Sequence, residues 1–350
     1  MRRCLVLLLP AALLTFACAD DDAADPVADL GGLDAALSDA APDMGGPAWE
    51  VVAGADPHGL MLSAWSRSPG EVYFVGGQAE TTGIARFDGQ ALSWLDNPGD
   101  RLAWWVFGFT EPALTFVVGE RGLGLRREGD GPWTTFETGV DEGTLFGIWG
   151  SAPDDLWTVG GHIAAGGPPI LRHWDGAAWR DAVVPDLGDA EPEAFFKVWG
   201  RGANDVFVCG DAGVILHFDG SEWHRLDTPG REAMFTVHGN VDSVWSVGGR
   251  ARGVIWRLDG DRFVEDGPSS AVAGLSGVFV APDGAVLAAG FNGLVLSRAP
   301  DGDWQNEPRK TTETLHAVWR TADGAVFAAG GTLQRFPGAT EGVLLRRAAP

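Results

Sequence analysis

The chain has 350 residues, of which 45% are hydrophobic and 21% charged, and its formal net charge is −23 at pH 7. This apolar content excludes general disorder, and the acidity excludes nucleic acid and anionic lipid as electrostatic partners. The 51 glycines and 16 tryptophans favour many short strands joined by tight turns over long helices.

Residues 1–17 have the composition of an export signal. Arg2 and Arg3 precede an apolar run over residues 5–14, which is too short to span a bilayer as a helix. The segment closes on Thr-Phe-Ala before Cys18, and a small residue directly before such a cysteine resembles the lipobox of bacterial lipoproteins. The resemblance implies cleavage after residue 17 and lipid attachment at Cys18. Cleavage by ordinary signal peptidase is the alternative.

Residues 18–46 predict a flexible tether. Positions 19–47 contain eight aspartates and no Lys or Arg, a composition that forms no core and repels itself. A random coil of this length spans roughly 30 Å root-mean-square. The predicted location is therefore the bacterial envelope, with membrane contact only through the lipid. The outer membrane or cell surface is favoured because Ala19, and not Asp, follows the cysteine.

Residues 47–350 contain seven repeats of about 42 residues. The pattern is clearest in GIWGSAPDDLWTVGG, residues 147–161, where two apolar runs flank a polar turn and end in glycines. A set of aligned positions, which we name the first-strand aromatic column, recurs at spacings of 42, 42, 50, 39, 41 and 40. Its members are Trp65, Phe107, Trp149, Trp199, His238, Phe279 and Trp319. The glycines that end the second run keep the same register, at Gly76, Gly119, Gly160, Gly210, Gly248, Gly290 and Gly330.

Each repeat predicts four short antiparallel strands. A third apolar run is followed in five copies by an Asp-Gly pair, which is typical of a hairpin that needs positive φ. One such sheet cannot bury both faces, whereas seven around an axis can, so we predict an all-β, seven-bladed β-propeller of four-stranded antiparallel blades. The Asp-Gly pairs begin at Asp88, Asp175, Asp219, Asp259 and Asp301, and tryptophans expected in the fourth strands are Trp94, Trp133, Trp179, Trp223 and Trp304. At repeated positions these rings indicate packing between blades.

The seventh repeat lacks a tryptophan for its fourth strand after Phe336-Pro337-Gly338. The segment PAWEVVAGA, residues 47–55, carries Trp49 ahead of the first complete repeat. We therefore predict that this N-terminal strand completes blade seven and closes the ring, which removes the free sheet edge. Residues 341–347 are the alternative candidate for that place.

With these motifs in view, the repeats resemble those of secreted bacterial propeller proteins with a VWG-x4-DVW-x-VG pattern, of Kelch-like or BNR-like type. The resemblance covers residues 47–350 and implies fold and export. The Kelch-like feature is a hydrophobic strand ending in Gly-Gly, seen at residues 72–77, with the later aromatic pair Phe87 and Trp94.

No nucleophile or cofactor motif emerges from the sequence. The single tyrosine, Tyr73, aligns with Trp157 and Trp245, and Cys209 aligns with valines, so both are predicted to be packing residues. We assign no catalytic residue and predict no cofactor and no metal centre. A basic column in the third strands is predicted to pair with acids of the same blade, such as Asp155 or Asp205. Its members are Arg86, Arg126, His173, His217, Arg257 and Arg335, with Ser297 in the remaining copy.

Blade three departs from the repeat by two insertions, residues 162–169 and 185–193. The first joins strands two and three, and the second joins strand four to the next blade. In an antiparallel four-stranded unit these connections emerge on one face, where repeat proteins usually bind their ligands. The candidate ligand-binding rim comprises His162, Asp186, Asp189, Glu191 and Glu193, with Glu80 from blade one. A Ca²⁺ site in these loops would lack the ordered ligand spacing of known Ca²⁺-binding loops.

These observations favour an exported, lipid-anchored, non-catalytic binding module for a protein or glycan at the envelope, working as a monomeric propeller. One alternative is an envelope enzyme, a hydrolase or lyase, that acts on polysaccharide. Another is a scaffold subunit of an outer-membrane assembly complex.

Overall fold

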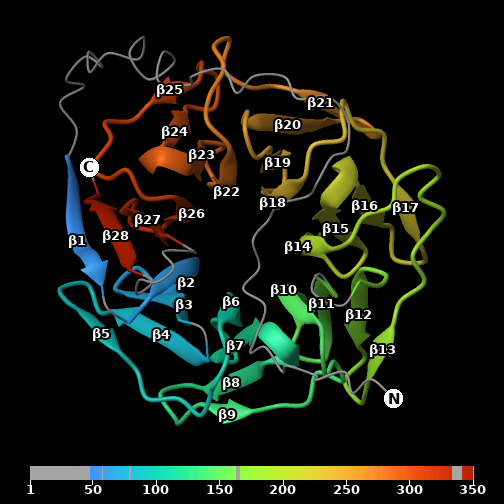
Figure 1. Cartoon of the computed structure of the whole chain (residues 1–350), viewed down its shortest axis with the longest axis horizontal. Helices are drawn as coiled ribbons and strands as arrows, with labels where there is room; N and C mark the ends of the chain where they lie inside the picture. The colour runs from blue at the N-terminus through green and yellow to red at the C-terminus, as the bar shows by residue number, and fades with distance from the viewer. Residues whose placement is uncertain (1–47, 57, 79, 163–165, 333–340, 350) are drawn as a thin grey trace, which may run out of the picture.

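The computed structural model describes residues 48–349 except 57, 79, 163–165 and 333–340. The described residues contain 28 β-strands in seven four-stranded antiparallel sheets. The sheets are arranged radially, with one strand of each near the central axis (Figure 1). The predicted seven-bladed β-propeller is therefore confirmed. Within the described part of the chain, no helix has the length and apolarity that a membrane crossing requires.

The blades follow one another in chain order, and the strands of each run from the innermost outward. Blade one is formed by β2 (Leu60–Ser68), β3 (Glu71–Gln78), β4 (Thr81–Phe87) and β5 (Leu92–Trp94). Blade two is formed by β6 (Ala103–Phe109), β7 (Leu114–Gly119), β8 (Gly124–Glu128) and β9 (Thr134–Thr135). Blade three is formed by β10 (Thr144–Ala152), β11 (Asp155–Gly161), β12 (Ile170–Trp174) and β13 (Trp179–Asp181). Blade four is formed by β14 (Phe195–Gly202), β15 (Asp205–Gly210), β16 (Ile215–Phe218) and β17 (Trp223–Arg225). Blade five is formed by β18 (Met234–Gly239), β19 (Val244–Gly248), β20 (Val254–Asp259) and β21 (Arg262–Glu265). Blade six is formed by β22 (Leu275–Val280), β23 (Val286–Gly290), β24 (Val295–Arg298) and β25 (Gln305–Asn306). Blade seven is β26 (Leu315–Arg320), β27 (Val326–Gly331), β28 (Gly342–Arg347) and β1 (Trp49–Asp56).

The Asp-Gly turns between third and fourth strands are built as predicted in four of the five copies. In blade four, Gly220 has a φ of 95°, and the Asp219 carboxylate accepts hydrogen bonds from the backbone N–H groups of Ser221 and Glu222. These bonds hold the pKa of Asp219 far below its usual range. Asp301-Gly302 differs, because Gly302 lacks a positive φ and donates its N–H to the Ala299 carbonyl.

The first-strand aromatic column packs each blade against the next, which confirms its predicted role. The Trp149 ring lies where a side chain on Gly200 of blade four would be, and Trp65 has the same relation to Gly108 of blade two. At the ring closure, the Trp319 indole N–H donates to Ser66 Oγ of blade one at 2.9 Å. The core therefore lies between blades, where apolar side chains of neighbouring sheets meet.

The glycines that end the second strands are required because the backbone of the preceding linker approaches them closely. A Cβ on Gly248 would lie 2.0 Å from the Ala233 carbonyl oxygen, which cannot move without displacing β18. We expect Gly248→Ala to lower the free energy of unfolding by about 1–3 kcal/mol in urea titrations. Gly202→Ala is the matched control, because a Cβ there has nothing within 4 Å. Equal stability of the two variants would contradict this account.

Blade seven is completed by the N-terminal strand, as predicted. β1 pairs antiparallel with β28, and Trp49 is buried against blades six and seven. The alternative segment also joins the blade, because β28 is its third strand and lies between β27 and β1. The two segments therefore occupy adjacent places and do not compete for one.

The third-strand basic column pairs within its own blades, with one correction. His173 lies 2.6 Å from Asp155 and His217 lies 2.8 Å from Asp205, as predicted. In blade seven the column residue is Arg346, which pairs in register with Phe327 and contacts Glu50 at 3.1 Å. The sequence prediction named Arg335 here, which lies outside the described residues, whereas Arg346 holds the register position of the column in β28. The acid partners of Arg86, Arg126 and Arg257 are Glu71, Glu128 and Asp266.

Several predictions concern residues outside the described part of the chain. These are the export signal over residues 1–17, Cys18 as lipid attachment site, the tether over residues 18–46, and Arg335 itself.

Candidate functional site

One face of the propeller carries the connections from second to third strands and from each fourth strand to the next blade. We name it the loop face. In blade three, Gly161 at the end of β11 forms a bridge with Ala194 at the end of the linker to blade four. The Asp211 N–H of blade four also donates to the Ala194 carbonyl. The predicted placement of both blade-three insertions on one face is confirmed.

The chain enters and leaves the propeller on the opposite face. β28 pairs with the end of β27 through Gly342 at the loop face and runs away from it to Arg347. β1 is antiparallel to β28 and pairs Trp49 with Arg347. Trp49, the first residue of the propeller, therefore lies at the face opposite the insertions.

The second insertion of blade three is fastened over blade four. Asp189 contacts the Arg231 guanidinium at 2.7 Å, and Arg225 donates to the Leu187 carbonyl. Asp186 accepts the Gly188 N–H at 2.9 Å and so stabilises the turn of the insertion. These two predicted rim acids therefore have structural partners.

The remaining predicted rim residues do not converge on them. Glu191 and Glu193 are exposed and form no hydrogen bond or ion pair with another described residue. The His162 ring lies beside Gly143, the last residue of the linker that leads into blade three. Glu80 is exposed on the turn between β3 and β4 and has a φ of 63°. Among the described residues, no group of three or more His, Cys, Asp or Glu could hold a metal ion.

Charge on the loop face is divided between two sides of the ring. The linkers from blade two to three and from blade three to four, residues 136–143 and 182–194, contain seven acids and no Lys or Arg. The linker from blade six to seven instead presents Arg309 and Lys310, both exposed. Blades three and six lie on opposite sides of the axis (Figure 1). The loop face is therefore acidic over blade three, whereas between blades six and seven it carries both cations and carboxylates.

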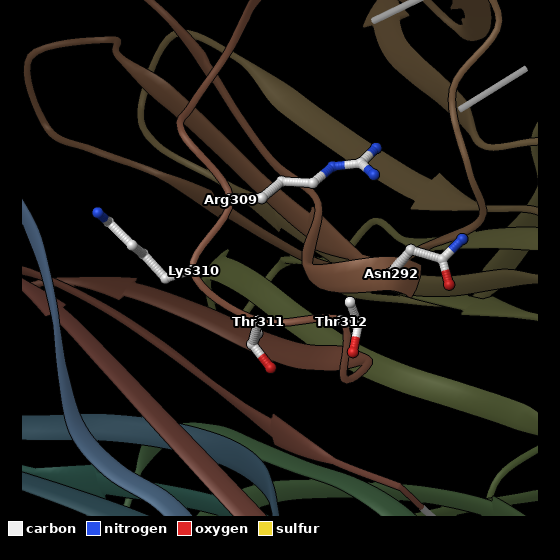
Figure 2. Close-up of a pocket in the computed structure, with 5 residues that line it drawn as sticks. All are labelled: Asn292, Arg309, Lys310, Thr311 and Thr312. Carbon is white, nitrogen blue, oxygen red and sulfur yellow. The ribbon is translucent and has the colours of Figure 1, made fainter. Parts of the chain in front are cut away.

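The linker between blades six and seven lines a pocket that the sequence did not predict. A volume of about 400 Å³ lies between Asn292, in the short 3-10 turn η4 (Phe291–Gly293), and residues 309–312. Figure 2 shows that the Arg309 and Lys310 side chains extend in different directions. A neighbouring pocket of about 220 Å³ reaches Val51 of β1 and includes Glu313 and Glu341. Taken together, the two pockets are thus lined by both cations and carboxylates.

Every innermost strand has a β-bulge at the same place, three residues before the aromatic column. In β10, for example, the pairing steps from Leu145 to Gly147 and leaves Phe146 out of the ladder. Bulges re-aim a side chain relative to the sheet. We name the seven residues the bulge circle: Leu62, Trp104, Phe146, Phe196, Phe235, Ser276 and His316.

The bulge circle is aromatic on one side of the axis. Ring centroids are 4.8 Å apart for Trp104 and Phe146, 5.6 Å for Phe146 and Phe196, and 5.3 Å for Phe196 and Phe235. Four consecutive blades thus form a continuous aromatic arc near the loop-face ends of the inner strands. Ser276 and His316 supply polar groups in blades six and seven.

Lys197 of β14 is buried next to this circle. Its side chain is 8% exposed, and its ammonium donates to the Phe146 carbonyl at 2.7 Å. The same nitrogen lies 3.9 Å from the centroid of the Trp105 ring in blade two. No described carboxylate forms an ion pair with it, and burial lowers its pKa to about 7. Three blades therefore meet at one cation.

The residues that could serve as nucleophile or proton donor are largely occupied by packing. Tyr73 is fully buried and donates to Glu71 Oε1 at 2.6 Å, and burial together with this bond raises its pKa to about 12. Burial likewise raises the pKa of Cys209 to about 12. Both are packing residues, as predicted. Burial also raises the pKa of Glu120, in the 3-10 turn η2 (Glu120–Gly122) of the loop face.

Comparison with known proteins identifies the fold. Neither a protein-family model nor a curated protein sequence matches the chain. The WD40 repeats of RRP9 match with a TM-score of 0.65 and 13% identity over 86% of this chain and 98% of theirs. YCF48 from Cyanidioschyzon merolae matches with a TM-score of 0.64 and 14% identity over the same shares. An inactive virginiamycin B lyase from Staphylococcus aureus, crystallised with quinupristin, matches with a TM-score of 0.67 and 10% identity over 86% and 99%. At these identities the likeness shows the β-propeller fold and nothing of activity.

Proposed function

We propose that this protein is an exported, lipid-anchored binding module that captures a protein or glycan ligand at the bacterial envelope through its loop face. The proposal rests on two features that lie on opposite faces of the propeller. The blade-three insertions lie on the loop face, whereas Trp49, where the tether of residues 18–46 joins the propeller, lies at the opposite face. A lipid at Cys18 would therefore attach the propeller through the face opposite the loop face and leave the loop face free.

The division of charge supports binding as the role of this face. The acids of residues 182–194 lie over blades three and four, and only Asp189 among them forms an ion pair with a described base. Exposed charges of one sign steer an oppositely charged partner and fix its orientation. We expect the partner to present a basic surface to blades two to four.

The experiment is an affinity capture from solubilised envelope proteins and cell-wall glycans. The bait is the chain from residue 18 onward with Cys18→Ser, compared with Glu191→Gln/Glu193→Gln and with a copy whose two blade-three insertions are shortened. We expect the shortened bait to lose the partner and the double variant to bind it roughly 5- to 30-fold more weakly, as loss of peripheral charge pairs costs about 1–2 kcal/mol.

The matched control is Glu111→Gln/Asp242→Asn, which removes two exposed acids from first-to-second-strand turns on the opposite face. It should retain the partner at full affinity. If all the baits hold the same partner equally, the loop face is not the binding surface and the proposal fails.

A further inference from the structure

Lys197 has an unusual position for a lysine. The other basic side chains of the innermost strands, Arg67, Arg201 and Arg320, each contact a carboxylate. Lys197 has none within 4 Å among the described residues, although more than nine-tenths of its side chain is buried. A buried cation without a counter-charge is costly, and proteins normally pair such groups.

The groups that face Lys197 do not replace the missing anion. An ammonium has three N–H donors, of which one reaches the Phe146 carbonyl and one side rests on the Trp105 ring. Cys209, opposite in the β14–β15 ladder, stays protonated because burial raises its pKa. His316 of β26 donates Nε2–H to the Gly331 carbonyl and stays neutral near pH 7, because burial lowers its pKa to about 4. No charge from these strands neutralises the ammonium.

The bulge circle lies beside this cation, which contacts it at the Phe146 carbonyl, and solvent reaches part of the circle. Trp104, Phe235, Ser276 and His316 are all partly exposed, although they lie on innermost strands. The Trp104–Phe235 arc offers ring faces and edges, and Ser276 offers a hydroxyl on the other side. An apolar body bound against the arc would gain burial, while an attached anionic group could approach the ammonium.

We propose that Lys197 and the bulge circle form a binding site for a carboxylate carried on an aromatic or apolar body, at the loop-face end of the axis. A single cation matches the single charge of a carboxylate and leaves a phosphate dianion half uncompensated. The inference deepens the proposed binding function, which it presupposes, by naming the ligand chemistry. It places recognition at the axis, whereas the capture experiment tests the rim.

The test uses the fact that the chain has only two lysines, Lys197 and Lys310. The chain from residue 18 with Cys18→Ser, labelled with ¹³Cε-lysine, gives two lysine signals whose pH titrations NMR can follow. Lys310→Met assigns both signals even if a Lys197 variant does not fold. The probe is sodium benzoate, and benzamide is its uncharged analogue of the same shape.

We expect benzoate to raise the pKa of Lys197 saturably by about 1–3 units, as a carboxylate within about 4–6 Å does, and to leave the exposed Lys310 unchanged. In Trp104→Ala a higher benzoate concentration should be needed to saturate the Lys197 shift, because one ring of the aromatic arc is lost. If the Lys197 titration is the same with and without benzoate, or shifts equally with benzamide, the site does not bind carboxylates. If the capture fails but benzoate raises the pKa of Lys197, ligand binding at the rim is refuted and the carboxylate site at the axis is retained.

Discussion

Replacing Trp49 by alanine is expected to lower the free energy of unfolding by about 3–5 kcal/mol, the range for truncating a buried tryptophan. Trp49 is 5% exposed, packs with the inner apolar cluster of blades six and seven, and donates its indole N–H to Glu307 at 3.2 Å. The Arg347 guanidinium contacts both the Trp49 ring and Glu307. One truncation therefore disturbs the packing and the polar contacts that close the ring.

The measurement is urea unfolding followed by circular dichroism, with amide hydrogen exchange of β28 as a local readout. Trp133→Ala is the matched control, since Trp133 is 6% exposed but lies within blade two. Because β1 pairs only with β28, we expect fast exchange along β28 in Trp49→Ala and not in Trp133→Ala. Unchanged exchange of β28 would show that the N-terminal strand is not held by this side chain.

Replacing Lys197 by methionine is expected to stabilise the protein below pH 7 and to remove a rise in stability between pH 7 and 9. Burial lowers the pKa of Lys197 to about 7 from an ordinary value of 10.5. Above pH 7 the folded state loses this proton while the unfolded state keeps it. The free energy of unfolding of the unaltered chain should therefore increase by about 1.4 kcal/mol per pH unit in this window.

Other titrating groups limit the pH range in which Lys197 determines how stability changes with pH. His238 and His316 have pKa values lowered by burial to about 3 and 4, so their contributions to stability are complete near pH 7. Cys209 has its pKa raised from 9.0 to about 12, so ionisation of the unfolded thiol above about pH 9 opposes and offsets the rise that Lys197 causes. Urea titrations at pH 7, 8 and 9 measure the slope. A slope that persists in Lys197→Met but disappears in Lys310→Met would contradict the assignment.

The architecture was predictable because two landmarks repeat in register. The first-strand aromatic column and the glycines after the second run each mark a fixed place in the sheet, so seven copies predict seven blades. Blade seven was only partly predictable, since Arg335 was assigned to the column by sequence spacing alone, whereas the described strand β28 carries Arg346. Only pairing with Phe327 identifies Arg346 as the column residue.

The candidate site was less predictable, for physical reasons. The common face of the blade-three insertions followed from the alternating direction of the strands. The sequence did not show that Asp189 forms an ion pair with Arg231, which gives it a structural role. A β-bulge depends on backbone pairing, and the varied residues of the bulge circle leave no common sequence mark. Lys197 would ordinarily be taken for a surface residue. The one available signal was its place three residues after Ala194, inside an apolar strand.

The bulge occurs in all seven innermost strands, but the residue at the bulge differs from blade to blade. The same backbone irregularity accommodates Leu62, Trp104, Ser276 and His316. The frame therefore does not depend on which side chain occupies the position. Substitutions around the axis can accumulate without loss of the fold, so proteins built on this repeat could acquire new specificities one blade at a time.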